Sequence, residues 1–256
     1  MWFRDLPYAG MLAGLILLGL GSCAETIGTE PDTVAEVAQT DEQSPAIAPS
    51  DYLFAPCNLP VARTDCVLLA AGGKRVLIGA PAGIGGGRIA GDQIPPDGVI
   101  LMSFDAQTIE GLDEVRNRAW ISGRRRPLSV AGGVGIKRVI TALNEAYITS
   151  DALAYVKGER RGGFDVEAMT AVEVLPGDFA FNTGDLTVTA LAAGNDQLAL
   201  WIDYEGIAVL LSDCGAQPKE VAAWPIADHY LGCEGTDYPV ASQTSWPLTT
   251  RVYISR

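Results

Sequence analysis

The segment 198–211 has the pattern of two apolar strands joined by a tight turn. Apolar residues fill both halves. Glu205-Gly206 lies between them, where a glycine readily adopts the positive φ that short hairpin turns need. A hairpin this apolar must be covered by other elements, and the chain is 48% hydrophobic, which is enough to build a full core. The segment therefore predicts a sheet with a packed interior.

Strand and helix patterns alternate along the rest of the body. Strands are predicted at 66–70, 74–78, 98–103, 127–130 and 186–190, and helices at 108–118, 136–147 and 218–223. The first two strands flank a turn at Gly72-Gly73. Two strand-rich halves interleaved with helices favour a sheet sandwich covered by helices.

Residues 1–22 resemble the signal peptide of a bacterial lipoprotein. Arg4 precedes an apolar run, 8–20, that is shorter than the roughly 20 residues of a membrane-spanning helix. The run ends in Leu20-Gly21-Ser22-Cys23, which resembles a lipobox, so Cys23 is the expected lipid-bearing N-terminus of the mature protein. The alternative is an uncleaved anchor with a chance cysteine. Ala24 rather than Asp follows the cysteine, which by resemblance to lipoprotein sorting in Gram-negative cells implies the outer membrane, facing the periplasm.

An acidic, polar segment follows Cys23. Residues 24–51 contain seven Asp and Glu residues and no Lys or Arg, with Pro, Ser, Thr and Gln filling much of the remainder. Such a composition buries too little apolar surface to offset the entropy of ordering. We therefore expect residues 23–51 to be the lipidated cysteine with a flexible tether, and residues 52–256 to be the folded domain. The alternative is an extension docked on the surface of that domain.

Four further cysteines remain, Cys57, Cys66, Cys214 and Cys233. In an oxidising compartment an even number permits two disulfides, and three pairings are possible. The local pairs, Cys57 with Cys66 and Cys214 with Cys233, are favoured, with buried free thiols as the alternative. The formal net charge of −13 disfavours nucleic acid as a partner, because an acidic surface repels phosphates.

The order of segments over about 56–256 resembles the metallo-β-lactamase superfamily, in particular its RNase Z/arylsulfatase-like branch of metal-dependent hydrolases. Four segments carry the resemblance: the paired strands 66–78, the strand-loop-helix 99–112, the arginine-rich stretch with its glycine turn 123–135, and a helix ending in Asn144-Glu145-Ala146-Tyr147. The resemblance implies an α+β fold, a single-domain four-layer αββα sandwich. It also implies a hydrolytic centre with two zinc ions.

The metal-binding positions of that family are degenerate in this chain. Where family members have His-x-His-x-Asp-His, this chain has Ser103, Asp105, Gln107 and Thr108. By the same resemblance, Ala193 falls at or near a further histidine and Arg256 near the last one. The bridging aspartate aligns, across a one-residue gap, with Asp213.

These substitutions remove the donors that zinc requires. Zinc requires neutral imidazole or thiolate donors, and a catalytic zinc ion typically takes three protein ligands plus an activated water. The chain has one histidine, His229, which is either a relict ligand or, more commonly for a lone histidine, a packed residue. We therefore assign no catalytic residue and expect no zinc or other cofactor. Asp105 and Asp213 either hold a hard cation such as Mg²⁺ or Ca²⁺, or cap loops and face water.

The sequence thus predicts a non-catalytic lipoprotein of the cell envelope with a binding or scaffolding role. Its expected partners are a membrane, through the N-terminal lipid, and a protein or small-molecule ligand. The alternatives are a metal-dependent hydrolase of ester or phosphodiester bonds with an altered metal site, and a purely structural envelope lipoprotein. An arginine cluster, Arg116, Arg118, Arg124, Arg125 and Arg126, either contacts an anion or partner, or forms intramolecular salt bridges.

Overall fold

The computed structural model describes residues 47–57, 66–84, 95–158, 162–233 and 240–254. The chain divides into two units, Met1–Asp41 and Glu42–Arg256, and every described residue belongs to the second unit. The predicted signal peptide, Cys23, residues 24–46 of the predicted tether and Arg256 lie outside the described residues.

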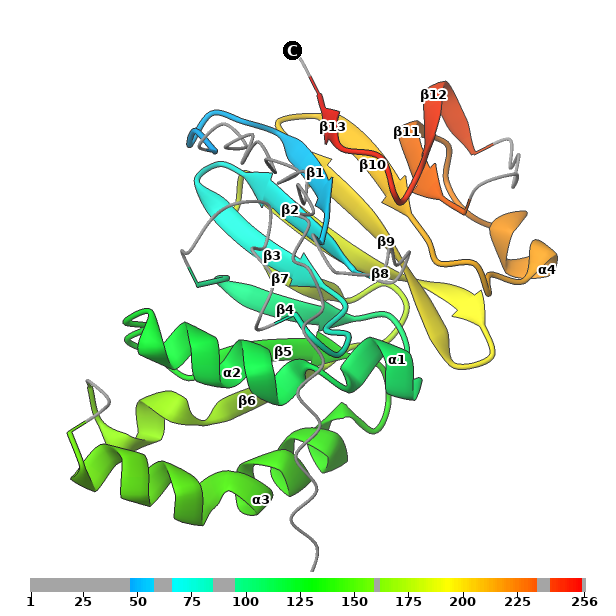
Figure 1. Cartoon of the computed structure of the whole chain (residues 1–256). Coiled ribbons are helices and arrows are strands. Elements are labelled where there is room, and N and C mark those ends of the chain that lie inside the picture. The colour runs from blue at the N-terminus through cyan, green and yellow to red at the C-terminus, as the bar shows by residue number, and fades with distance from the viewer. Residues whose placement is uncertain (1–46, 58–65, 85–94, 159–161, 234–239, 255–256) are drawn as a thin grey trace, which may run out of the picture. The chain divides into compact units, whose positions relative to one another are not determined.

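The first sheet has seven strands in the order β13-β1-β2-β3-β4-β5-β6 (Figure 1). Its strands are β1 Leu53–Pro56, β2 Val67–Ala71, β3 Lys74–Ile78, β4 Gly98–Leu101, β5 Leu128–Gly132, β6 Met169–Glu173 and β13 Val252–Tyr253. The four strands from β3 to β6 are parallel, while β1, β2 and β13 pair antiparallel. Parallel neighbours need crossover connections, and the helices after β4 and β5 supply them.

The second sheet has six strands in the order β12-β11-β10-β9-β8-β7. Its strands are β7 Phe179–Asn182, β8 Leu186–Gly194, β9 Gln197–Tyr204, β10 Ile207–Leu211, β11 Ala227–Gly232 and β12 Ala241–Pro247. The hairpin predicted at 198–211 is confirmed as β9 and β10, with Glu205 at φ 52° and Gly206 at φ 84° in its turn. Strands β10, β11 and β12 are parallel, so their carboxyl ends lie at one edge of this sheet.

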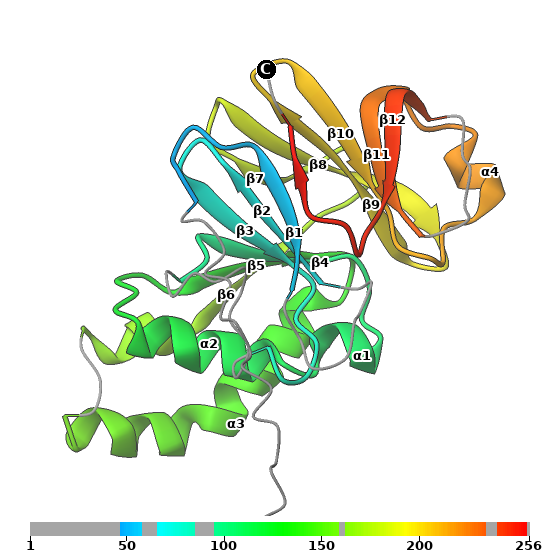
Figure 2. The same cartoon turned by 45° about the horizontal axis from the view of Figure 1, so that its top comes forward.

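The two sheets pack face to face (Figure 2), and the largest apolar cluster lies between them. Leu69, Val76 and Ile100 of the first sheet meet Leu200 and Val209 of the second, and all five are almost completely buried. A sandwich core of this kind follows from strands that present apolar residues on the shared face.

Helices cover the outer faces. α1 Ala106–Ile109, α2 Leu112–Ile121 and α3 Ile136–Val156 lie on the side of the first sheet, and the short α4 Pro218–Val221 contacts β8 of the second sheet. The four-layer αββα sandwich expected from the sequence is therefore confirmed. None of the helices in the described segments is long and apolar enough to cross a membrane.

Two helix predictions were wrong in their bounds. The helix predicted at 108–118 is broken at Gly111, whose backbone N–H donates to the carbonyl of Ala80 at 2.7 Å. A Cβ at this position would collide with the carbonyl of Pro81 and lie 2.7 Å from a methyl of Ile84, so a close tertiary approach ends α1 and starts α2. The helix predicted at 136–147 continues to Val156.

The folded unit begins before residue 52. Ile47 packs against an apolar cluster of Leu53, Ala55, Leu68 and Ala70 on β1 and β2, and Asp51 accepts a hydrogen bond from the N–H of Ala48 at 2.8 Å. Residues 47–51, the last part of the predicted tether, thus lie against the first sheet.

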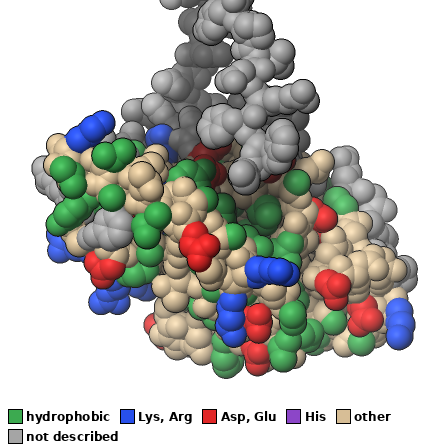
Figure 3. Space-filling model, turned by 90° about the horizontal axis from the view of Figure 1, so that it is seen from below, with side chains coloured by type: hydrophobic (Ala, Val, Ile, Leu, Met, Phe, Trp, Pro, Cys, Tyr) green, Lys and Arg blue, Asp and Glu red, His purple; other side chains and the backbone are tan. Residues whose placement is uncertain are grey.

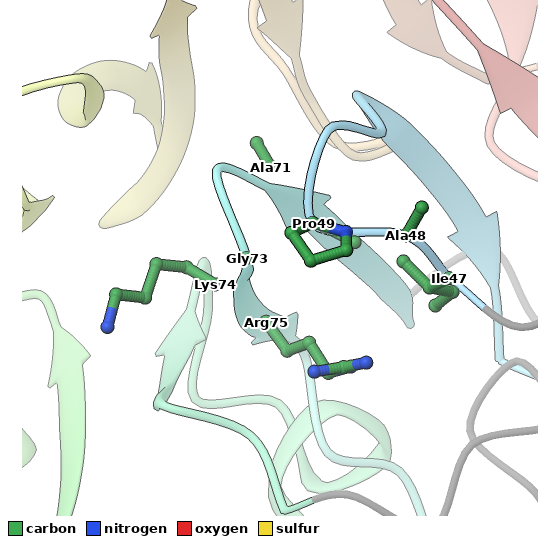
Figure 4. A pocket seen from close by; sticks show the side chains of 8 residues that line it. Ile47, Ala48, Pro49, Ala71, Gly73, Lys74 and Arg75 are labelled. Carbon is green, nitrogen blue, oxygen red and sulfur yellow. The ribbon is translucent and has the colours of Figure 1, made fainter.

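A small cavity lies between this segment and the β2–β3 hairpin (Figure 4). Its volume is about 50 Å³, and its lining comprises Ile47, Ala48, Pro49, Ala70, Ala71, Gly73, Lys74 and Arg75. The lining contains no carboxylate, thiol, hydroxyl or imidazole, and its only charged side chains are those of Lys74 and Arg75.

Candidate functional site

The loops that carry the degenerate metal positions meet at one edge of the sandwich. The N–H of Leu198, at the start of β9, donates to the carbonyl of Met102 just after β4 at 2.8 Å. Because β9 is antiparallel to β10, its start lies beside the end of β10, where Asp213 follows. The loops after β4 and β10 are therefore neighbours, as the sequence resemblance implies.

Three predicted site residues after β4 are hydrogen-bonded to one another. The hydroxyl of Ser103 lies 3.0 Å from Oδ2 of Asp105 and 3.1 Å from the hydroxyl of Thr108. Ser103 and Thr108 are buried, whereas Asp105 is exposed. The N–H of Thr108 also donates to the carbonyl of Asp105 at 2.8 Å, which closes the first turn of α1. This cluster joins the loop to the helix by hydrogen bonds within the chain.

Asp213 is half-buried in the loop after β10. Burial raises the pKa of its carboxyl above the usual value, and the negative charge of Asp105 adds to that shift. The backbone N–H of Gly215, which donates a hydrogen bond to Oδ1 of Asp213 at 2.9 Å, opposes it. The structure thus brings Asp105 and Asp213 close enough to repel each other. Two mutually repelling carboxylates hold a proton more readily than isolated ones.

Of the remaining predicted positions, Ala193 offers no ligand to this cluster. Ala193, in β8, is completely buried and presents only a methyl group, while its carbonyl accepts the N–H of Gln217 at 2.8 Å. Gln107 is exposed on α1.

Three side chains that the sequence did not single out occupy the space around these loops. A Cβ at Gly132, the last residue of β5, would lie 3.4 Å from the ring of Phe104. A Cβ at Gly215 would collide with the amide of Gln197, and one at Gly194 with the side chain of Gln217. Because these contacts join segments far apart in the sequence, no local pattern could have indicated them.

Gln197 also carries a buried Oε1 atom that has no hydrogen-bond partner in the segments that the structure describes. An unpaired buried carbonyl oxygen usually costs free energy. This unpaired acceptor lies at the start of β9, next to the β8–β9 turn.

His229 is not part of this cluster of loops. It lies within β11, paired with Val209 rather than at the carboxyl end of the strand, and its ring packs on that of Trp246 with the centroids 4.9 Å apart. Burial lowers the pKa of the imidazole, with the charge of Asp228 opposing the shift. The side chain therefore has the place of a packed residue in the sheet.

Both local disulfides are present. Cys57 is bonded to Cys66, and Cys214 to Cys233. The second bond joins the segments that follow β10 and β11, immediately after Asp213. Neither Cys214 nor Cys233 can therefore supply a thiolate ligand at this edge, because both sulfur atoms are bonded in the disulfide.

The residues present do not fit the two zinc ions that the sequence resemblance implies. Zinc requires imidazole, thiolate or carboxylate donors in a near-tetrahedral array. Here Ser103 and Thr108 share a hydrogen bond, Ala193 has no donor, and only Asp105 and Asp213 supply charged oxygens. Among the described residues, no three or more His, Cys, Asp and Glu side chains are arranged to hold a metal ion.

The arrangement of the two sheets is shared with known structures. The metallo-β-lactamase-fold protein YhfI from Bacillus subtilis superposes with a TM-score of 0.50 at 15% identity, over 75% of this chain and 77% of that protein. The chain has the metallo-β-lactamase fold. The short form of human tRNase Z is also similar, with a TM-score of 0.49 and 13% identity over 70% of this chain and 76% of its own. No protein-family profile and no curated sequence matches the chain.

Proposed function

We propose that this metallo-β-lactamase-fold chain is a non-catalytic lipoprotein of the cell envelope, with a role in binding or scaffolding. One observation carries the proposal. At the place where the family's main metal motif aligns, Ser103, Asp105 and Thr108 satisfy one another by hydrogen bonds. A metal-activated water needs electron-pair donors directed at a common point, and these side chains are directed at each other.

Metal content and turnover of the purified unit 42–256 test the absence of catalysis. Every described element lies in this unit, which supports its use as an isolated domain. We expect less than stoichiometric metal after incubation with zinc, magnesium or calcium. We also expect no chelator-sensitive hydrolysis of ester or phosphodiester substrates. The control is an Asp105→Asn variant, which keeps an oxygen acceptor for Ser103 and removes the charge.

Chelator-sensitive turnover that Asp105→Asn eliminates would overturn the non-catalytic assignment. It would establish the alternative, a hydrolase with an altered metal site. The residues that would then carry the chemistry are Asp105 and Asp213, whose carboxylates lie on neighbouring loops, since hard cations take oxygen ligands.

The envelope location rests on the sequence Leu20-Gly21-Ser22-Cys23 at the end of a short apolar run. Expression of the full chain in a Gram-negative host tests it. Cys23→Ser should accumulate as an unprocessed precursor, while the matched Ser22→Ala variant, which keeps a small residue there, should be processed normally. Globomycin should block processing of the wild type. If neither the inhibitor nor the Cys23 substitution changes the mature mass, the lipid anchor is absent.

A further inference from the structure

The carboxyl-terminal ends of α2 and α3 lie at the same end of the folded unit (Figures 1 and 2). Arg116 of α2 pairs with Asp151 of α3 at 2.7 Å and with Glu167 of η1, the 3-10 helix Phe164–Glu167, at 2.6 Å. Arg124, just beyond α2, donates to the carbonyls of Val166 and Glu167. These contacts fix the ends of both helices against η1.

The last three turns of α3 expose apolar side chains. Val156 is 81% exposed, Leu153 57% and Ile148 56%, with Tyr155 also exposed, and Ile121 at the end of α2 is 58% exposed. The exposed charged residues of α3 are Lys137, Arg138 and Glu145, all in its first half. The next exposed charged residue is Lys157, just beyond the end of the helix. Asp151, the one charged residue in between, is buried in the ion pair with Arg116. An exposed helix segment this apolar is unusual on a monomeric soluble domain.

Four exposed basic residues lie at the same end of the unit as these apolar side chains, together with the exposed Asp165 of η1. Arg118, Arg125, Arg126 and Lys157 are all exposed at this end, although Asp and Glu outnumber Lys and Arg by 31 to 18 in the chain as a whole. Figure 3 shows hydrophobic side chains at the left end of the helical face, with Lys and Arg side chains and some Asp or Glu side chains near them. We call this set of residues the helix-end surface: Ile121, Ile148, Leu153, Tyr155 and Val156 with Arg118, Arg125, Arg126 and Lys157.

We infer that the helix-end surface docks on a membrane that contains anionic lipids. Apolar and aromatic side chains bordered by Arg and Lys are the chemistry that inserts at the headgroup level and attracts anionic headgroups. The acidic residues 24–46 carry the charge opposite to that of this surface, but they include no aromatic residue and only scattered apolar ones, Ile27, Val34 and Val37 among them. Charge complementarity together with exposed apolar area therefore favours the membrane over the chain's own N-terminal segment.

This inference rests on the proposed envelope location, which supplies the membrane. If residues 24–46 formed the tether expected from their composition, they would span on the order of 25 Å, and a lipid at Cys23 would hold the domain close to the bilayer. At that effective concentration a weak contact is sufficient to orient the domain.

Flotation of the unit 42–256 with vesicles tests the docking surface. We expect binding to phosphatidylethanolamine vesicles that contain phosphatidylglycerol, weak binding to phosphatidylcholine vesicles, and loss of binding as salt is raised. Each basic residue removed should weaken partitioning about five-fold. Arg125→Glu combined with Arg126→Glu should therefore nearly abolish it, and Leu153→Ser combined with Val156→Ser should also weaken it. The matched control reverses Lys137 and Arg138, an exposed basic pair in the first turn of the same helix, and should bind as the wild type does.

Equal binding of the wild type and the Arg125/Arg126 variant, or no binding of the wild type to anionic vesicles, would overturn the inference. So would a dimer in sedimentation that dissociates on Val156→Ser, because a second copy would then be the occupant. Thermal unfolding checks that each variant folds. If the Leu153→Ser variant does not fold, the variant at the exposed Arg125 and Arg126 still tests the inference. The unit contains neither the signal nor Cys23, so this result is separate from the lipidation test on the full chain.

Discussion

The guanidinium of Arg116 donates two hydrogen bonds to the carboxylate of Asp151, at 2.7 and 3.1 Å, and joins α2 to α3 below the surface. The same guanidinium pairs with the buried Glu167 and lies 4.6 Å from the centre of the Tyr147 ring. The arginine cluster seen in the sequence therefore comprises two structural arginines, Arg116 and Arg124, and three exposed ones, Arg118, Arg125 and Arg126. Arg116 and Arg124 hold the fold together, and burial, with the nearby charge of Arg116, lowers the pKa of Arg124 to about 10 although Glu167 opposes the shift.

Arg116→Met should destabilise the fold strongly, because it removes the cation that pairs with the buried carboxylates of Asp151 and Glu167. Removal of one partner from a buried pair costs about 3–5 kcal/mol, measured by urea unfolding. Burial opposes ionisation of Asp151, but its hydrogen bonds, above all the one from Arg116, hold its pKa below the usual value. The wild type therefore loses this stabilisation as the pH falls through that lowered pKa. The difference between wild type and variant should thus shrink in acid.

The control for that experiment is Lys137→Met, which breaks the exposed pair between Lys137 and Glu173 at 3.5 Å. Its cost should be no more than about 1 kcal/mol, the upper end for surface pairs. A similar small cost for Arg116→Met would mean that the buried pairs contribute little to stability.

Gly111→Ala should be far more harmful than Gly133→Ala. A Cβ at Gly111 meets the carbonyl of Pro81 and a methyl of Ile84, and backbone atoms there cannot yield, so overpacking should cost about 3 kcal/mol or more. At Gly133 the same atom would lie 3.9 Å from its nearest neighbour, the carbonyl of Asp196, and the change should be nearly neutral. Thermal unfolding of both variants gives the comparison, and equal midpoints would contradict the role of Gly111 in separating α1 from α2.

The sequence was a good guide to features with a local cause. The β9–β10 hairpin was predicted because its apolar runs and Glu205-Gly206 turn are contiguous, and the strands around Gly72-Gly73 for the same reason. The break at Gly111 was missed because the carbonyl of Ala80 and the side chain of Ile84, distant in sequence, cause it.

The candidate site divides in the same way. The resemblance placed Ser103, Asp105 and Thr108 together, since all three follow one strand. The side chains of Gln197 and Gln217 entered only through folding, which brings the β8–β9 turn against the loop after β10. The helix-end surface was hidden for a different reason: its apolar residues continue the helical spacing of α3, and exposure rather than pattern distinguishes them from a core face.

Asp213→Asn should stabilise the protein at neutral pH. The pKa of Asp213 is raised in the folded state, so its ionisation opposes folding once pH exceeds that value, and the wild type regains this stability as pH falls through it. Asparagine keeps an oxygen for the N–H of Gly215 and removes the repulsion with Asp105, a gain of about 1 kcal/mol or less. The gain should vanish below about pH 4, where an ordinary aspartate is protonated.

Asp178→Asn is the matched control, since that exposed carboxylate also accepts a backbone N–H, from Leu175 at 2.9 Å. It should show no gain at neutral pH. If unfolding curves at pH 7 show Asp213→Asn to be less stable than the wild type, the charge at Asp213 is being satisfied, and a bound cation becomes the explanation to examine.

Replacement of both Cys214 and Cys233 by serine should cost about 3 kcal/mol, because the lost bond closes a loop of 19 residues and restricts the unfolded chain. The bond joins the segments after β10 and β11, the parallel strands beside Asp213, so its loss should also increase amide hydrogen exchange in the loop that contains Gly215. The double serine variant at Cys57 and Cys66 should lose a comparable amount of stability without that local effect, because its disulfide joins the segments that flank β1 and β2 in the other sheet. Thiol titration of the unfolded unit 42–256 should find no free thiol, and two or more would show that these pairs do not form in solution.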